Sequence, residues 1–296
     1  MIDHFISVII PTYNRASFLK TTINSLLRQE NYHSYEIIVV DDGSTDNTEE
    51  VVKGIKDHKV KYFKKQNGER AAARNFGANL AIGDYINFFD SDDIAYSNHL
   101  EEANNTIHEL RSPEVFHLDY DIKDPDGNLI RKSYNWPQTI NDRLIDGNHL
   151  SCNGVFVRKD IFAKNTFNEN RKLSASEDYE LWLRLASRYP FFCSSSVTST
   201  VINHDSRSVI KINPVNFLER IDLLQEELLK DVSFVQRYGK RASIFQSYLK
   251  VYTALHLAMA KQPKKECYTY LFEAVKLNPQ VIFTYRFIAA LKNIML

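Results

Sequence analysis

Two aspartates, Asp90 and Asp92, stand one residue apart at the end of an apolar run, in the sequence Phe-Phe-Asp-Ser-Asp-Asp. Residues two apart in an extended chain point to the same side, so both carboxylates can face one point. Carboxylate oxygens suit Mg²⁺ or Mn²⁺, which takes phosphate oxygens and water as its other ligands. The alternative is an acidic turn in which Asp93 or Ser97 caps the next helix. The surrounding elements must decide between the two.

A second acidic pair, Asp41 and Asp42, follows the apolar run Glu-Ile-Ile-Val-Val and precedes Gly43. The sequence Asp-Asp-Gly-Ser is typical of a tight turn, so a structural role is a strong alternative to ligand binding. A calcium-binding EF-hand loop is excluded, because its glycine occupies the sixth position of the loop and Gly43 occupies the third.

Arg74 and Asp178 are charged residues on predicted helices. Arg74 lies in an alanine-rich segment, which can pack close to a sheet or a ligand, although a solvated arginine fits the same pattern. Glu177 and Asp178 begin a strongly helical segment, where the helix dipole favours anions. Helix capping explains these two carboxylates as well as a catalytic base does, so the residues alone leave both roles open.

Short apolar segments alternate with segments of helical periodicity through the first 120 residues. We expect buried strands at residues 6–10, 36–40, 60–63 and 85–89, with helices between them. This alternation predicts an α/β fold, with a mostly parallel sheet flanked by helices. Ligands bind beyond the carboxyl ends of strands in such sheets. Three of these ends carry Pro-Thr-Tyr-Asn-Arg, Asp-Asp-Gly-Ser and Asp-Ser-Asp-Asp, which favours one shared ligand site.

The composition limits the classes of protein that the chain can belong to. Its 296 residues are 44% hydrophobic and 25% charged, enough for one large α/β domain with an appendage. The net charge is zero, so no nucleic-acid partner is indicated. Cys152, Cys193 and Cys267 are far apart, which argues against a disulfide framework or a zinc site. Without a signal peptide or a spanning segment, we expect a cytoplasmic protein.

The C-terminal part differs in character, since only helices are expected from about Pro214 onward. Between Val232 and the end of the chain, ten lysines and arginines are opposed by two glutamates. This basic region is either a solvated helical surface or a surface attracted to an anionic membrane or acceptor. Residues 280–296 are apolar around most of a helix, which either packs on the catalytic domain or lies in a membrane interface.

Five segments occur in order: VIIPTYNR, EIIVVDDGSTDNT, ARNFG, FFDSDD and EDYELWLRL. Together they resemble glycosyltransferase family 2, over roughly residues 5–190. The resemblance implies the GT-A fold, a Rossmann-like nucleotide-diphospho-sugar transferase fold, over residues 1–210, followed by a helical region over residues 211–296. A Rossmann dehydrogenase is not favoured, because no Gly-x-Gly-x-x-Gly follows the first strand, and a P-loop is also missing.

The resemblance also implies which residues contact the nucleotide-sugar donor, namely Pro11, Thr12, Tyr13, Arg15, Asp41, Asp42, Arg74, Asp90 and Ser91. Asp41, rather than Asp42, would hydrogen-bond to the base. Asp92 would ligate Mn²⁺ or Mg²⁺ directly, and Asp90 would contact the ribose or the metal. His204 is a further metal-ligand candidate in the looser match VINHDSRS, which also contains Arg207. Asp178 would be the general base.

The predicted activity is an inverting transfer of sugar from a nucleotide sugar, in particular a UDP-sugar. The acceptor would be a glycan or a polyprenyl-linked glycan, in the synthesis of a bacterial surface polysaccharide. The enzyme would be cytoplasmic or peripheral at the inner face of the cell membrane. Two alternatives remain open: a non-catalytic scaffold that binds nucleotide sugars, and a nucleotidyltransferase, which would release pyrophosphate from a nucleoside triphosphate.

Overall fold

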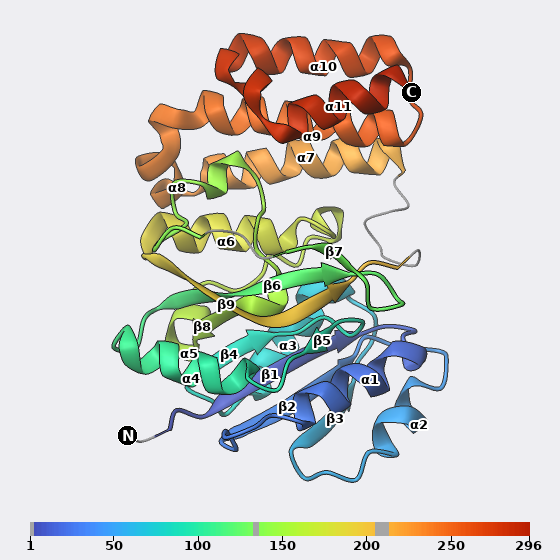
Figure 1. Cartoon of the computed structure of the whole chain (residues 1–296), viewed down its shortest axis with the longest axis vertical. Coiled ribbons are helices and arrows are strands. Elements are labelled where there is room, and N and C mark those ends of the chain that lie inside the picture. The colour runs from blue at the N-terminus through green and yellow to red at the C-terminus, as the bar shows by residue number, and fades with distance from the viewer. Residues whose placement is uncertain (1–2, 133–135, 205–212) are drawn as a thin grey trace. The chain divides into compact units, whose positions relative to one another are not determined.

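The computed structural model describes residues 3–132, 136–204 and 213–296. The chain divides into two compact units, and their elements are labelled in Figure 1. The first unit contains Met1–Ile140, Leu150–Arg171 and Tyr189–Asp205, and the second contains Asn141–His149, Lys172–Arg188 and Ser206–Leu296.

This division differs from the sequence-based boundary between residues 210 and 211, which itself lies outside the described residues. Asn141–His149 and Lys172–Arg188 were predicted to belong to the catalytic domain, yet they pack with the C-terminal helices. The reason is that α6 (Glu177–Arg188) packs against α7 (Pro214–Lys230) and α8 (Val232–Tyr238). Arg188 also donates a hydrogen bond to Asp231, at 2.6 Å.

The described strands all belong to the first unit and form one sheet, in the order β3-β2-β1-β4-β8-β6-β9-β5 with β7 paired to β6. They are β1 (Ile6–Thr12), β2 (Tyr35–Asp41), β3 (Val60–Lys64), β4 (Tyr85–Phe88), β5 (Ile94–Ala95), β6 (Val115–Lys123), β7 (Leu129–Arg131), β8 (Val155–Arg158) and β9 (Phe191–Ile202). The first four run parallel, as predicted. β8 then enters antiparallel between β4 and β6, and β9 lies parallel to β6, so the second half of the sheet is mixed.

Helices cover both faces of the parallel part of this sheet (Figure 1). The helices of the first unit are α1 (Ala16–Leu27), α2 (Thr48–Lys53), α3 (Glu69–Leu80), α4 (His99–Glu109) and α5 (Lys159–Phe162). Val8 and Ile10 share a buried core with Leu19 of α1 and Ile107 of α4. Ile9 and Val40 alternate to the other face, where they meet Gly77 of α3. The predicted α/β fold with flanking helices is confirmed.

Register places the polar strand ends side by side. Thr12 lies opposite Asp41 on the neighbouring strand, and Asp41 lies opposite Lys64 on the next. The backbone amide of Asp42 donates a hydrogen bond to the carbonyl oxygen of Thr12, at 2.8 Å. Strands β1 and β2 therefore end at one level and open into adjacent loops.

The second unit is helical, as predicted for the C-terminal region. Its main helices are α6, α7, α8, α9 (Ala242–Met259), α10 (Lys264–Leu277) and α11 (Tyr285–Met295), with short 3₁₀ turns at η1 (Leu144–Asp146) and η5 (Pro279–Phe283). Leu257, Leu271, Phe287 and Ile294 belong to a core that joins α9, α10 and α11. No described helix is long and apolar enough to cross a membrane.

Candidate functional site

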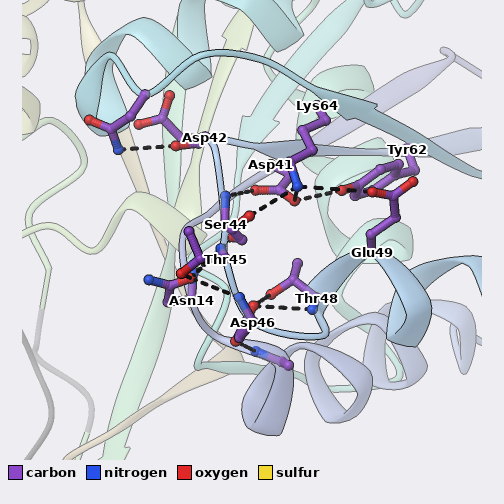
Figure 2. Close-up of polar contacts among 12 residues, drawn as sticks. Asn14, Asp41, Asp42, Ser44, Thr45, Asp46, Thr48, Glu49, Tyr62 and Lys64 are labelled. Atoms are coloured by element: carbon purple, nitrogen blue, oxygen red, sulfur yellow. Dashed lines mark hydrogen bonds and ion pairs between the residues drawn. The ribbon is translucent and has the colours of Figure 1, made fainter.

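Asn14 ties together the two loops that follow β1 and β2, as Figure 2 shows. It adopts a left-handed conformation with φ of 51°, which asparagine tolerates better than most residues. Its side-chain oxygen accepts a hydrogen bond from the amide of Thr45 at 2.8 Å, and its own amide donates to the Ser44 hydroxyl at 2.9 Å. Asp46 adds a bond from the amide of Ala16 at 3.2 Å. The two loops therefore form one preorganised rim.

Asp41 is completely buried beneath this rim (Figure 2). One carboxylate oxygen accepts from the amide of Ser44 at 2.7 Å, and the other accepts from the Tyr62 hydroxyl at 2.5 Å. Burial, and then this bond to Asp41, raise the pKa of Tyr62 above its ordinary value. Asp41 can touch a nucleotide base only if neighbouring atoms move, so its donor-binding role stays a prediction.

Asp42 is held by the loop that precedes α3. Its Oδ1 accepts from the Lys65 ammonium at 2.8 Å and from the amide of Gly68 at 2.9 Å. The Asn67 side chain donates to the Asp42 carbonyl oxygen at 3.0 Å. Asp42 thus fixes the approach to α3, the helix that carries Arg74.

Arg74 and Asp90 form an ion pair at the end of β4. The guanidinium of Arg74 is almost fully buried and lies 2.9 Å from Asp90 Oδ1, and its Cζ lies 5.2 Å from the ring centre of Phe167. The Asp90 side chain remains 30% exposed. This pair brings together two residues predicted to contact the donor, with the carboxylate as the accessible member.

Asp92 meets His204 and Arg15 at the same edge of the sheet. The His204 Nε2 atom lies 3.1 Å from Asp92 Oδ2, and Arg15 Nη1 lies 3.9 Å from that oxygen. The His204 ring stacks on Phe18 of α1, with ring centres 4.6 Å apart. Three residues predicted separately from the sequence therefore converge, although His204 follows Asp92 by more than a hundred positions.

Asp93 and Asn153 position this cluster, and the sequence did not identify that role. Asp93 is fully buried, and its carboxylate accepts from the amide of Ile202 at 2.9 Å and from the Asn153 side chain at 2.8 Å. Asn153 also accepts from the amide of Asp90 at 2.8 Å. Asp93 therefore anchors the end of β9, two residues before His204. Capping of the next helix by Asp93 or Ser97 was the alternative to a metal site in the sequence; in the structure Asn98 stands at the N-cap of α4, and Asp93 forms a buried junction.

The remaining predicted donor residues lie around the end of β1 and the start of the β4 loop. Thr12 is buried, and its hydroxyl oxygen has no hydrogen-bond partner within the described ranges. Tyr13 is about half exposed, Pro11 is partly buried, and Ser91 is buried. Arg207 lies outside the described residues. The unsatisfied Thr12 hydroxyl is available for a ligand hydrogen bond.

The Asp92 and His204 side chains have the chemistry to hold a divalent cation. A carboxylate oxygen and an imidazole nitrogen suit Mn²⁺, and Mg²⁺ sites commonly use one or two carboxylates completed by water and substrate phosphates. No cluster of three or more histidine, cysteine or acidic side chains that could hold a metal occurs among the described residues. The residues fit an ion that is shared with a phosphate ligand.

Asp178, the predicted general base, belongs to the second unit, at the start of α6. Its Oδ1 accepts from the amide of Tyr179 at 2.7 Å, and its Oδ2 accepts from the Asn148 side chain at 3.1 Å. Asp178 also lines a cavity of that unit. A carboxylate held at both oxygens, yet facing a cavity, suits proton transfer as well as helix capping.

The family assignment follows from comparison with known proteins. The family model described as glycosyl transferase family 2 matches residues 7–164, more than half of the chain. The chain belongs to glycosyltransferase family 2. The resemblance predicted from the sequence is thereby confirmed. The matched range includes every predicted donor and metal residue except His204, and it ends before Asp178.

Individual members of the family give the same assignment. An uncharacterised glycosyltransferase of Rickettsia conorii is 31% identical over 274 residues, covering 88% of this chain and 44% of that protein. The chain spans less than half the length of this relative and of its counterparts from Rickettsia bellii and Rickettsia felis.

Two solved structures confirm the GT-A fold. Staphylococcus aureus TarS in complex with UDP has a TM-score of 0.68 at 20% identity, covering 98% of this chain and 88% of that one. A mannosyltransferase of Pyrobaculum calidifontis in complex with GDP-Man and Mn²⁺ has a TM-score of 0.60 at 16% identity, covering 100% of this chain and 88% of that one.

Proposed function

We propose that this glycosyltransferase family 2 chain transfers a sugar from a nucleotide-sugar donor to a glycan acceptor, with inversion at the anomeric carbon. The observation that carries the proposal is the convergence of Asp92, His204 and Arg15 beyond the strand ends. This is where α/β sheets bind ligands. A carboxylate and an imidazole that could share a cation, with a guanidinium near them, suit a diphosphate better than a neutral ligand.

The proposed donor is a UDP-sugar. TarS, whose fold this chain shares, was solved with UDP, and the mannosyltransferase was solved with GDP-Man and Mn²⁺. The buried hydroxyl of Thr12 and the carboxylate of Asp90 are two groups that a nucleoside could engage. Tyr13, which follows Thr12 in the chain and is about half exposed, offers an aromatic face for the base.

In the proposed mechanism, Asp178 takes the proton of the acceptor hydroxyl as that oxygen attacks the anomeric carbon. The bond to the nucleoside diphosphate breaks, and negative charge develops on the departing phosphate. Arg15 supplies positive charge near Asp92. A divalent cation bound by Asp92 and His204 would supply Lewis-acid stabilisation of the same charge. The ion pair with Arg74, at 2.9 Å, holds the Asp90 carboxylate in its orientation.

The identity of the released product tests this proposal against its two alternatives. Purified protein is incubated with UDP-, GDP- and dTDP-sugars, Mn²⁺ and a broad acceptor panel. We expect release of a nucleoside diphosphate that stops when EDTA is added. Pyrophosphate released from nucleoside triphosphates would identify a nucleotidyltransferase. Donor binding without any product would favour the scaffold.

A peripheral membrane location is a further part of the proposal, with a polyprenyl-linked glycan as acceptor. The C-terminal helices carry exposed apolar side chains, Phe272, Phe283, Tyr285 and Ile288, among exposed lysines. We define these four residues as the apolar C-terminal surface. Aromatic residues flanked by basic ones are typical of helices that lie in a membrane interface.

A further inference from the structure

A cavity of about 210 Å³ lies inside the second unit, and Asp178 is part of its wall. The opposite walls come from the C-terminal helices: Tyr248 and Tyr252 of α9, and Arg286 of α11. The sequence motifs stop at α6, so nothing in them indicated that α9 and α11 share a cavity with the predicted base. Aromatic walls with a few convergent polar groups are typical of small-molecule sites.

Arg286 is held firmly in this cavity. Its guanidinium donates to the carbonyl oxygen of Asn148 at 3.2 Å and lies 4.9 Å from the ring centre of Tyr248. The facing backbone is at Gly147, with φ of +123°. A β-carbon there would lie 2.2 Å from Nη1 of Arg286 and 2.3 Å from Tyr248 Cε1. Only glycine leaves room for both side chains at this position.

Arg286 forms no ion pair with a carboxylate in the described part of the chain. Across residues 3–132, 136–204 and 213–296, no carboxylate lies within ion-pair distance of it. Among the residues that line the cavity, the other charged side chain is Asp178. A half-buried arginine without an anionic partner is costly, because its charge is partly removed from water. An anionic ligand would relieve that cost.

A second arginine adds to the positive potential. Arg220 of α7 donates to the carbonyl oxygen of Ser174 at 3.1 Å, and its buried Nε has no hydrogen-bond partner in the described part of the chain. Burial, and then Arg220 and Arg286, lower the pKa of His256 to about 4, so that ring is neutral at physiological pH. Arg286 and Arg220 therefore both act on this neighbourhood, and Asp178 is the acidic side chain among the residues that line the cavity.

We propose that this cavity is an acceptor subsite for a glycan that carries an anionic group, a phosphate or a carboxylate, bound by Arg286. The planar guanidinium binds either group through two parallel hydrogen bonds, and the tyrosine rings pack against the sugar. The anion on Arg286 places a neighbouring hydroxyl at Asp178. This inference rests on the proposed function, because it takes Asp178 as the general base.

The test compares matched acceptors on the whole chain. Methyl glucoside is the neutral probe, methyl glucuronide carries a carboxylate, and methyl glucoside 6-phosphate carries a phosphate; galactoside counterparts extend the panel. Binding is measured by calorimetry, and transfer is measured as nucleoside diphosphate release with Mn²⁺ and each donor. We expect at least one anionic member to bind at least 10-fold more tightly than its neutral counterpart. The carboxylate and phosphate arms show which group the site prefers.

Three variants locate this preference. Arg286→Gln should bring the affinities for anionic and neutral acceptors to within about 2-fold of each other, because the guanidinium that binds the anion through two hydrogen bonds is lost. Arg286→Lys keeps the positive charge but lacks the planar guanidinium, so it should retain an intermediate ratio of anionic to neutral affinity. Lys292→Gln, an exposed position on the same helix, removes the same charge away from the cavity and should keep the wild-type ratio.

The outcomes separate this inference from the proposed function. Transfer without any anionic preference, or a preference that survives Arg286→Gln, overturns the inference and leaves the function standing. If no donor yields a nucleoside diphosphate, the proposed function fails, and the binding arm alone decides the anion site. Anion binding that needs Arg286 then supports the site, and equal binding by wild type and Arg286→Gln overturns it.

Discussion

Four aspartates at the strand ends of the sheet, Asp41, Asp90, Asp92 and Asp93, have different surroundings, although each follows an apolar run in the sequence. Asp41 and Asp93 are fully buried, and each accepts hydrogen bonds at both oxygens. Asp90 and Asp92 keep part of their surface, 30% and 14% of the side chain respectively. Hydrogen bonds within the protein therefore occupy the carboxylates of Asp41 and Asp93, while those of Asp90 and Asp92 remain accessible to a ligand.

Asp93→Ala should destabilise the first unit by about 2–4 kcal/mol, because two buried donors lose their acceptor. Those donors are the amide of Ile202 and the side chain of Asn153. Urea unfolding followed by circular dichroism measures the change. Asp126→Ala, at an exposed loop position, is the control and should stay within about 0.5 kcal/mol of wild type. Equal stability of the two variants would show that Asp93 does not anchor β9.

At the level of single residues, the sequence named the side chains that meet at the candidate site. It did not identify the neighbouring side chains that hold them. Resemblance to the family named Asp92 and His204, and the structure pairs them at 3.1 Å. Asn153 could not be identified from the sequence, because its hydrogen bond to Asp93 joins residues sixty positions apart and no local pattern predicts it. The preference for Asp41 as a base-binding residue also took no account of Tyr62, which lies on another strand.

Among the elements, helix α3 depends on a close approach to the sheet. A β-carbon on Gly77 would lie 2.5 Å from Ile9 Cγ2 and 3.0 Å from Val40 Cγ2. Arg74 is one turn earlier on the same helix, so this packing also sets where its guanidinium meets Asp90.

Gly77→Ala should therefore destabilise the protein by about 1–3 kcal/mol, through overpacking. This reverses the usual sign, since alanine is favoured over glycine in a helix by roughly 1 kcal/mol. Asn79→Ala, exposed on the same helix, should change stability by less than about 0.5 kcal/mol. The free energy of unfolding in urea is measured for both variants. If Gly77→Ala were more stable than wild type, α3 would not lie so close to the sheet.

His99 makes the stability of the first unit depend on pH. It joins α4 to β9 and β4, with Nδ1 2.9 Å from the Thr198 hydroxyl and Nε2 3.4 Å from the Asn87 side-chain oxygen. Complete burial lowers its pKa to about 3. Below pH 6.5 the unfolded chain binds a proton that the folded chain does not, so stability falls as the pH drops from 6.5 toward 3.

The slope contributed by His99 should approach about 1.4 kcal/mol per pH unit at the centre of that window. His99→Gln should reduce the slope of the unfolding free energy against pH by up to this amount. Part of the slope should remain, because His117 is also buried and its pKa is lowered to about 3. Urea unfolding between pH 7.5 and about pH 4.5 measures both slopes. Identical slopes would mean that His99 is protonated in the folded state.

Periodicity in the sequence identified β1 to β4 and the helices between them, because each is a local pattern of apolar residues. It did not indicate that β8 enters antiparallel between β4 and β6, since strand pairing joins segments far apart in the chain. The family resemblance, not the periodicity, placed α6 in the catalytic domain, because the motif EDYELWLRL lies in that helix. Its packing partners, α7 and α8, lie beyond the motif.

For the molecule as a whole, the sequence left two roles for its last residues: packing on the catalytic domain, or lying in a membrane interface. The structure packs part of this segment on other helices of the second unit, and the membrane role stays a prediction. Phe287 and Ile294 are buried against α9 and α10, whereas Phe283 and Tyr285 are strongly exposed. Deleting residues 280–296 would remove part of this core and could unfold the second unit. Exposed positions are therefore the better probe of membrane binding.

Phe283→Ser with Tyr285→Ser should weaken binding to vesicles at least 10-fold, because each aromatic ring contributes roughly 1.5–3 kcal/mol when buried. The vesicles contain phosphatidylglycerol and phosphatidylcholine, and phosphatidylcholine alone is the comparison for charge. Leu129→Ser with Ile130→Ser removes exposed apolar side chains from β7 and is the matched control. Co-sedimentation that is equal for all three proteins would contradict a membrane role for the apolar C-terminal surface.

The central claim is that one sugar-transfer reaction uses Asp92 to hold the donor and Asp178 to remove the acceptor proton. The most direct test measures kcat for nucleoside diphosphate release and the donor Kd with Mn²⁺ for wild type, Asp92→Asn and Asp178→Asn. We predict that Asp178→Asn lowers kcat by about 10²–10⁴-fold with the donor Kd within about 3-fold of wild type, whereas Asp92→Asn weakens donor binding. A wild-type kcat in Asp178→Asn, or an unchanged donor Kd in Asp92→Asn, would contradict the account.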